Sequence, residues 1–387
     1  MKAYFADLHI HIGRTASYQP VKITAANSLT LENILIEASQ HKGMDIIGII
    51  DCHVPEVLAS LKDKVEKGIC KELEDGGISY GNTTLFLGTE TEIYDEWSSG
   101  PIHVLSYFPT ISSMESFSRW MEGKMKNITL SSQRIYAAGK EYQQKVKELE
   151  GLFIPAHIFT PHKSMYGSGV KASLSEVFVP EWIDGVELGL SSDTEMARGI
   201  GELSRYPFLT NSDAHSLAKI GREYQKLLLK EPSFEEFRMA LQELNGRRIL
   251  ANYGLNPLLG KYHSTVCEKC GQGAEASQSE CAFCGHKRLT KGVSQRIREI
   301  SGTPPSFNRS RPPYIHQVPL QFIPGIGPKT LNVLKKRFGT EMAVLHSAAR
   351  EELEETVSPK TASLIIAARE GRLNVKSGGG GTYGRIQ

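Results

Sequence analysis

The chain has 387 residues, of which 40% are hydrophobic and 23% charged, as is ordinary for a globular protein of two or three domains. It contains no run of 18 apolar residues and no signal-like start, so we expect no membrane span and a cytoplasmic location, on the nucleoid in a prokaryote. Residues 257–387 hold 19 basic and 10 acidic residues, whereas residues 1–256 hold 26 basic and 33 acidic ones. The basic part is a candidate polyanion binder, although charge segregation that only keeps two domains soluble is the alternative.

Up to about residue 255, strand-like runs alternate with helix-like segments. The strand-like runs lie near residues 2–8, 44–50, 83–93, 101–107, 151–157, 184–190 and 206–211. The helix-like segments lie near 29–42, 56–75, 113–149, 193–204 and 233–245. This alternation is typical of an α/β fold with parallel strands and crossover helices, and seven units are enough to close a barrel.

Histidines and carboxylates lie in or just after these strand-like runs. Three pairs of these residues stand two positions apart: His9 and His11, Asp51 and His53, and Asp213 and His215. Because side chains at i and i+2 of a strand share a face, both members of each pair can reach one ion. A single such histidine can equally be a hydrogen-bonded core residue, but repetition at strand ends favours a site of two or three metals (Zn, Mn or Mg) at a barrel mouth. The candidate ligands are His9, His11, Asp51, His53, Glu90, His103, His157, Asp213 and His215.

Four cysteines form one cluster after the barrel. Cys267 and Cys270 are followed after ten residues by Cys281 and Cys284, and this spacing predicts two knuckles that share one structural zinc. Lys287, Arg288 and Lys291 flank the cluster, so we expect the ribbon to face DNA.

The C-terminal segment Phe322-Ile-Pro-Gly-Ile-Gly-Pro-Lys329-Thr330 resembles a helix-hairpin-helix motif, which binds nucleic-acid backbone without reading bases. An ordinary helical turn is the alternative. Gln317-Val-Pro-Leu320-Gln-Phe322 also resembles a bacterial sliding-clamp peptide, although Leu320 and Phe322 are more simply core residues. The expected DNA contacts of this module are Gly325, Gly327, Lys329, Thr330, Lys335, Lys336 and Arg337.

These features predict five parts. They are a metal-dependent barrel (1–255), a zinc ribbon (256–291), a basic linker or extended strand (292–316), a helix-hairpin-helix module (317–376) and a disordered glycine-rich tail (377–387).

The motifs Asp7-Leu-His9-Ile-His11, Asp51-Cys-His53, Gly88-Thr-Glu90, His103, Ala156-His157 and Asp213-Ala-His215 resemble the motif series of the PHP (polymerase and histidinol phosphatase) superfamily. The resemblance implies a distorted seven-stranded β/α barrel that binds up to three metals and hydrolyses phosphoesters. It implies all the ligands named above except Asp51, which rests on strand geometry alone.

Four residues are expected to act in catalysis. Glu90 and Asp213 are the carboxylates among the implied ligands. Many relatives have another histidine shortly after the first pair, where this chain has Gly13-Arg14-Thr15, so Arg14 is expected to bind phosphate. Asp193, just past the run at 184–190, either orients water or binds metal, or it caps the following helix.

A PHP barrel, a four-cysteine ribbon and a helix-hairpin-helix module, in this order, resemble the endonuclease Q family over the whole chain. That family nicks DNA 5′ of deaminated bases (deoxyuridine, deoxyinosine and deoxyxanthosine) and of abasic sites, which implies damaged DNA as the partner and attack by a metal-activated hydroxide. A small-molecule phosphatase and a noncatalytic DNA-binding scaffold are the alternatives. The ribbon, the hairpin and the basic half argue against the first, and the ligand set argues against the second.

Overall fold

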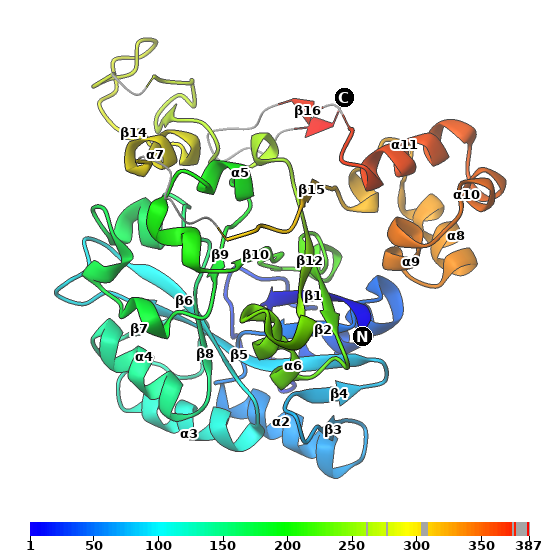
Figure 1. Cartoon of the computed structure of the whole chain (residues 1–387), viewed down its shortest axis with the longest axis horizontal. Helices are drawn as coiled ribbons and strands as arrows, with labels where there is room; N and C mark the ends of the chain where they lie inside the picture. The colour runs from blue at the N-terminus through cyan, green and yellow to red at the C-terminus, as the bar shows by residue number, and fades with distance from the viewer. Residues whose placement is uncertain (261, 276–277, 303–308, 374, 377–384, 387) are drawn as a thin grey trace.

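The computed structural model describes residues 1–260, 262–275, 278–302, 309–373, 375–376 and 385–386 (Figure 1). Seven strands, five of one sheet and two of another, are joined into a ring by backbone hydrogen bonds. In ring order they are β1 (Lys2–Ile10), β2 (Ile46–Ile49), β5 (Thr83–Ile93), β6 (Ile102–Phe108), β8 (Leu152–Pro155), β9 (Val186–Glu187) and β10 (Phe208–Leu209). The amide of Ile158 donates to Glu187 O (2.9 Å) between β8 and β9. Beyond β10 the chain returns to β1, where the amide of Ala214 donates to His9 O (3.0 Å).

The predicted α/β fold class is confirmed, but the strands are not all parallel. Strands β1, β2 and β5 run parallel, as do β9 and β10. Strand β6 runs antiparallel to both β5 and β8. The connection between β5 and β6, residues 94–101, contains no helix, and a parallel pair would need a crossover of a dozen or more residues.

Six short strands extend this ring and were not predicted. Strands β11 (Tyr224–Leu229), β12 (Arg248–Gly254) and β15 (Tyr314–His316) continue the sheet outward from β1. Strands β3 (Lys71–Glu72) and β4 (Ile78–Tyr80) form a hairpin beside β5, and β7 (Arg134–Ile135) pairs with the end of β5.

An apolar cluster fills the ring and decides which end is open. It draws alternate side chains from most of the ring strands, as a small barrel requires. Helix α6 (Phe234–Leu241) closes one end, because Phe234, Phe237 and Leu241 join the same cluster. The members from the ring strands are Ala6, Leu8, Ile46, Phe86, Leu105, Tyr107, Leu152, Ile154 and Leu209.

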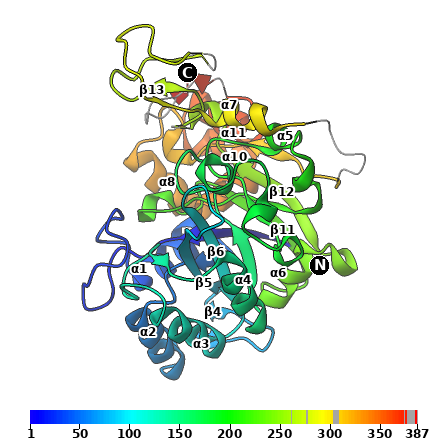
Figure 2. The same cartoon turned by 90° about the vertical axis from the view of Figure 1, so that its left-hand side faces the viewer.

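Helices cover the outside of the ring (Figure 2). The long segment predicted at 113–149 is two helices, with β7 between them. Among the described residues, no helix is both long and apolar enough to cross a membrane. The helices around the barrel are α1 (Leu31–Ile36), η1 (Glu37–Lys42), α2 (Pro55–Glu66), α3 (Ile111–Glu122), α4 (Gly139–Glu148) and α5 (Thr194–Ala197). Short helical turns are η2 (Met165–Gly169), η3 (Leu174–Glu176), η4 (Pro180–Trp182), η5 (Gly201–Arg205), η6 (Leu217–Lys219), η7 (Leu244–Gly246) and η8 (Pro257–Leu259).

The segment predicted as a basic linker is instead bound to the barrel. It contains helix α7 (Val293–Ile300) and strand β15, and its residues 303–308 lie outside the described part. Arg296 donates to the carbonyls of Tyr166 (2.6 Å) and Lys171 (2.8 Å), and Arg311 donates to Leu203 O (2.7 Å). These arginines therefore satisfy backbone carbonyls of the barrel and are not available as a loose DNA-contacting strand.

The ribbon and the C-terminal helices lie beyond the barrel, at the upper left and right of Figure 1. The ribbon pairs β13 (Val266–Cys267) with β14 (Leu289–Thr290). The C-terminal helices are η9 (Leu320–Phe322), α8 (Pro328–Phe338), α9 (Glu341–His346), α10 (Arg350–Thr356) and α11 (Pro359–Arg369). Within the predicted tail, β17 (Arg385–Ile386) pairs with β16 (Val375–Lys376), while residues 377–384 and 387 lie outside the described part.

Helix α9 docks the C-terminal helices onto the barrel. His346 stacks on Phe5 with ring centroids 4.4 Å apart, and its Nε2 lies 2.7 Å from the Tyr224 hydroxyl. Close by, the buried pair Lys42 and Glu341 is 3.1 Å apart. These contacts hold α9 against β1, β11 and η1.

The same joint overturns the prediction of a sliding-clamp peptide. Gln317 is 3% exposed and contacts the Tyr224 hydroxyl, and Leu320 is fully buried. A clamp would have to pull both side chains out of this joint in order to bind them. Of the three residues that define the clamp motif, Gln317, Leu320 and Phe322, only Phe322 is exposed, at 44%.

We predict that this joint weakens in mild acid. Burial lowers the pKa of His346 to about 3, helped by the positive charges of Lys226 and Arg369. In the unfolded chain His346 binds a proton near pH 6.5, whereas in the folded chain it stays neutral at this pH. The free energy of unfolding therefore decreases as the pH falls below 6.5. Between pH 7 and pH 5.5, this one histidine lowers the free energy of unfolding by about 1 kcal/mol.

The measurement is the melting temperature at pH 7 and 5.5 for the wild type and for His346→Gln, which keeps a polar group near the Tyr224 hydroxyl but does not titrate. The variant is expected to lose less stability than the wild type on acidification. Equal losses in the two proteins would contradict the assignment.

Candidate metal centre and its pocket

All nine predicted ligands lie on the ring strands or in the loops that follow them, at the end opposite α6, and seven of them form three overlapping groups. Within each group the candidate ligand atoms lie within 4.8 Å of one another. Glu90 belongs to two groups and so does His11, which makes the three groups one continuous cluster. The groups are His9, His11 and Glu90; His11, Asp213 and His215; and Glu90, His103 and His157.

Three buried ring nitrogens of this cluster have no hydrogen-bond partner among the described residues. Nε2 of His9, His11 and His103 is buried and makes no hydrogen bond within the described part of the chain. Nε2 of His9 and of His11 each lies 3.4 Å from Asp213 Oδ1, too far for a strong hydrogen bond. Buried polar atoms without a partner require an explanation, and an ion bound between these atoms supplies one. The residues therefore fit a metal centre.

The outer nitrogens are held by the protein. Nδ1 of His9 donates to Glu187 (2.9 Å), and Nδ1 of His11 lies 3.2 Å from Asp51 Oδ2. Nδ1 of His157 lies 3.1 Å from Thr160 Oγ1. Such partners fix the ring orientation and leave the opposite nitrogen free for a metal.

The charge states of two groups suit a metal centre, whereas neighbouring carboxylates outweigh burial and raise the pKa of His9 and His157. Burial alone would raise the pKa of Glu90, but His103 and Lys22 together hold that pKa well below its usual range. Burial lowers the pKa of His215 to about 4 despite the nearby carboxylate of Asp213. At neutral pH the carboxylate is therefore ionised and the imidazole neutral, which are the forms that bind metals.

Two candidate ligands have strained backbone conformations. Asp213 has φ 46° and His157 has φ 30°, values in or near the left-handed region that side chains other than glycine rarely adopt. Such conformations persist only where the surroundings enforce them, and they gather at functional sites. Both residues follow a strand, so the strain marks the point where the chain leaves the barrel to aim a side chain at the cluster.

Asp51 and His53 stand beside the cluster and are absent from its three groups. Strand β2 ends at Ile49, so the alternation from which both were predicted no longer holds at these positions. Asp51 instead accepts from the amide of Ile12 (2.7 Å) and orients His11. Nδ1 of His53 lies 2.9 Å from the Thr89 hydroxyl.

Asp193 and Arg14, both predicted to be catalytic, lie apart from the cluster. The Asp193 carboxylate caps α5 by accepting from the amide of Met196 (2.9 Å) and lies 3.0 Å from Nε2 of His316. The helix cap is thus the alternative that the structure shows. Arg14 donates to Asn27 (2.9 Å) and lines a different depression.

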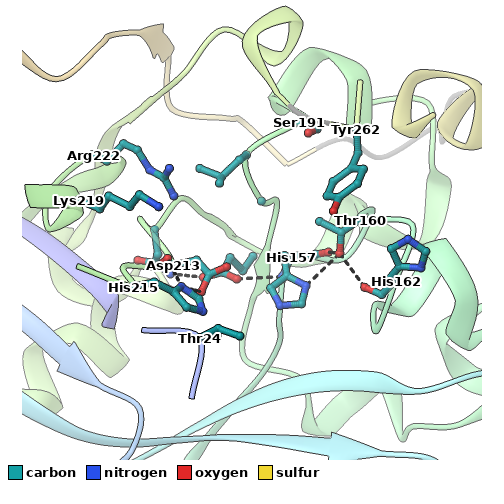
Figure 3. Close-up of a pocket in the computed structure, with 14 residues that line it drawn as sticks. Thr24, His157, Thr160, His162, Ser191, Asp213, His215, Lys219, Arg222 and Tyr262 are labelled. Atoms are coloured by element: carbon teal, nitrogen blue, oxygen red, sulfur yellow. Dashed lines mark hydrogen bonds and ion pairs between the residues drawn. The ribbon is translucent and has the colours of Figure 1, made fainter. Parts of the chain in front are cut away.

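The cluster opens into a pocket of about 430 Å³ (Figure 3). Asp213, His157 and His215 belong to the cluster and also line the pocket. Lys219 and Arg222 lie on one side in Figure 3, and His162 and Tyr262 lie on the other. The pocket thus has ligands on its floor, cations on one wall and aromatic rings on the opposite wall.

The four ribbon cysteines converge on one point. Cys267 Sγ lies 3.6 Å from Cys284 Sγ, and Cys270 Sγ lies 3.5 Å from Cys281 Sγ. Four thiolates at 2.3 Å around one tetrahedral zinc would be about 3.8 Å apart. Nearby, Lys287 and Arg288 are exposed, whereas Lys291 pairs with Glu299 at 2.7 Å.

The predicted hairpin lies between η9 and α8. Gly325 has φ 90°, which favours glycine, and Gly327 caps α8 with open space where a side chain would lie. Lys329, Lys336 and Arg337 are exposed, while Thr330 and Lys335 are partly buried. The first turn of α8 thus presents free amides at an accessible surface.

Several residues at the site were not predicted. Glu187 ends β9 and orients His9, so the strand-end rule applied to the run at 184–190 would have found it. Lys22 and Ser132 reach Glu90 from two loops, and no periodic signal marks either of them. Lys219 and Arg222 follow β10 by about ten residues and carry no motif.

Comparison with known proteins places this geometry in a family. Residues 193–245 match the model of the PHP-associated family PHP_C. The uncharacterized protein YqxK of Bacillus subtilis is 59% identical over 387 residues, which is 100% of both chains. The lesion-specific endonuclease PfuEndoQ of Pyrococcus furiosus has a similar structure, with a TM-score of 0.86 and 30% identity over 100% of this chain and 95% of that chain.

A second solved structure is an endonuclease Q bound to a 27-mer duplex with an abasic lesion at its active site. Its TM-score is 0.84 at 30% identity, covering 100% of this chain and 96% of that chain. The likeness therefore includes the barrel, the ribbon and the C-terminal helices together. The chain belongs to the endonuclease Q family, an enzyme family within the PHP superfamily.

Proposed function

We propose that the chain is a metal-dependent DNA repair endonuclease that cuts the phosphodiester 5′ of deoxyuridine, deoxyinosine, deoxyxanthosine and abasic sites. One observation carries the proposal: the ligand cluster forms the floor of a pocket with a cationic wall. A phosphate that enters such a pocket meets metal ligands and positive charge together. A DNA substrate also implies a cytoplasmic location, where a prokaryote keeps its chromosome.

Two or three divalent ions (Zn, Mn or Mg) would be held by the three ligand groups. When bound, they would activate a water molecule and neutralise charge on the phosphoryl and leaving oxygens. Glu187, Asp51 and Thr160 keep the imidazoles of His9, His11 and His157 aimed at the cluster. The chain thus contributes a rigid ligand set whose geometry is fixed before the substrate arrives.

The cationic wall is suited to the phosphate group. Lys219 and Arg222 line the pocket from the loop that follows β10, on the same side as Asp213 and His215. A scissile phosphate would be held between these cations and the cluster. Positive side chains at this place also stabilise the charge that develops in the transition state.

The opposite wall is suited to a base that has left the duplex. Tyr262 and His162 pack edge to face, with ring centroids 6.0 Å apart. The pocket volume of about 430 Å³ falls within the range of about 300–1,000 Å³ found for small-molecule sites. Extruding a base costs less when its pairing is already weak, which favours deaminated and abasic positions.

The ribbon and the hairpin would hold the duplex on either side of the pocket. Lys287, Arg288 and the start of α8 at Lys329 offer charge and backbone amides to phosphates. Such contacts carry no sequence information, so the lesion itself would decide where the chain cuts.

The first test is a nicking assay with Mn²⁺ or Mg²⁺ on labelled duplexes. Each duplex carries one deoxyuridine, deoxyinosine, deoxyxanthosine, abasic site or no lesion. We expect a single nick on the 5′ side of the lesion and none in undamaged DNA. Denaturing gels against size standards locate the cut.

Asp213→Asn is the matched control, because asparagine tolerates the left-handed backbone at this position. The rate should fall by more than about a hundredfold, since even partners behind a ligand are worth about 10–100-fold. Lesion-independent cutting, or cutting that survives this substitution, would contradict the proposal.

A second prediction concerns the ribbon. Cys281→Ser should remove one equivalent of zinc per chain and weaken binding to duplex DNA, because the short ribbon depends on its metal to fold. Cys70→Ser is the matched control, since Cys70 is a buried thiol outside the four-cysteine group. Metal content by mass spectrometry and DNA affinity by fluorescence anisotropy are measured together. An unchanged zinc content in Cys281→Ser would show that the ribbon holds no such ion.

A third prediction concerns the hairpin. Lys329→Met should weaken binding to damaged and undamaged duplexes equally and reduce the salt dependence of binding by about one phosphate contact. Lys145→Met, on the outer helix α4, is the control and should leave both unchanged. If Lys329→Met altered only the binding of damaged DNA, a backbone-contacting hairpin would be the wrong interpretation.

A further inference from the structure

The two carboxylate oxygens of Glu90 have different surroundings. Within the described part of the chain, Oε1 faces only imidazoles: it lies 2.9 Å from Nδ1 of His103, 3.3 Å from Nε2 of His157 and 3.5 Å from Nε2 of His9. All three belong to the ligand groups described above. This oxygen is therefore placed to serve the metal centre.

Oε2 instead faces an ammonium group. Nζ of Lys22 lies 3.2 Å from it, and the Ser132 hydroxyl donates to it. Nε2 of His11 is farther away, at 3.7 Å. A positive charge of this chain thus lies where a second metal contact of Glu90 would otherwise form.

Lys22 is held in this position from both sides. Its Nζ donates to the Ser132 hydroxyl at 2.6 Å, and its side chain is only 15% exposed. The amide of Lys22 donates to Ile12 O (2.9 Å), and the amide of Ser131 donates to Val21 O (3.0 Å). Ser132 has φ 55°, a left-handed value that the surrounding loop must enforce. The ammonium is thus fixed by two loops that meet over the cluster.

We propose that the Lys22 ammonium is a built-in cation of the metal centre. It neutralises Oε2 of Glu90 and repels a divalent ion from that side, so Glu90 serves the metals through Oε1 alone. Lys22 thereby limits how many ions the barrel binds, or how tightly it binds one of them. The inference rests on the proposed metal centre and adds to it a residue that competes with metal.

A purely positioning role makes the opposite prediction. If Lys22 only aimed Glu90 at the ions, removing its charge would loosen the carboxylate and weaken metal binding. If Lys22 competes with an ion, removing its charge strengthens binding, because like charges no longer repel at short range. The sign of the change separates the two roles without any measurement of activity.

The barrel metals are first removed from the full chain with a chelator, and the chain is then titrated with Mn²⁺ alone. Calorimetry measures the affinity, and metal analysis measures the number of Mn²⁺ ions bound per chain. We expect Lys22→Met to gain one equivalent of Mn²⁺ or to bind one equivalent at least tenfold more tightly. Lys22→Arg, which keeps the charge, should match the wild type. Lys145→Met removes a cation on the outer helix α4 and should also match it.

Lys22→Gln, which keeps a donor for Ser132 but no charge, covers the case in which the methionine variant does not fold and should show the same gain. Unchanged or weaker Mn²⁺ binding in the folded, uncharged variant would overturn the inference while leaving the proposed function intact. A wild-type barrel that takes up no Mn²⁺, Zn²⁺ or Mg²⁺ would overturn the metal centre itself, and this inference with it.

Discussion

A buried negative charge at the open end of the barrel is the constraint on which the rest of the structure depends. The Glu90 side chain is 1% exposed, and an ionised carboxylate out of water costs several kcal/mol unless positive groups surround it. Four imidazoles and one ammonium converge on it from the ring strands and from two loops. The ring brings these groups together, and the loops that leave its strands provide the groups that hold them.

Features that depend on the local sequence could be predicted, whereas features that depend on contacts between distant segments could not. His9, Glu90 and Asp213 were found because each lies in or just after an apolar run, a signal that the local sequence carries. His53 stays a prediction, because β2 ends two residues before Asp51 and the alternation from which it was predicted does not extend into the turn. The antiparallel β6 and the approach of Lys22 to Glu90 depend on loop lengths and on contacts between distant segments, which periodicity does not encode.

The number of basic residues in the C-terminal part overstates how many of them are available to contact DNA. Arg296 and Arg311 lie in the basic region, yet both donate to backbone carbonyls of the barrel. Arg309 likewise binds Glu243 and the carbonyl of Leu241. A count of basic residues cannot separate charges that anchor a segment from charges that face solvent. Exposed cations remain on the ribbon and along α8, where helix geometry adds free amides to the charge, and others lie at Arg298, Arg350, Lys360 and Arg372.

The docking of α9 has a mechanical consequence. His346 stacks on Phe5, and Phe5 and His9 lie on the same strand, four residues and about 13 Å apart. A hydrogen-bonded strand barely stretches, so β1 acts as a rigid spacer between the C-terminal helices and the ligand cluster. A molecule bound both by the C-terminal helices and by the ligand cluster would therefore be held in a single register. Under the proposed function, the spacing between a phosphate bound at the C-terminal helices and the phosphate at the cluster is thereby set by a single strand of the barrel.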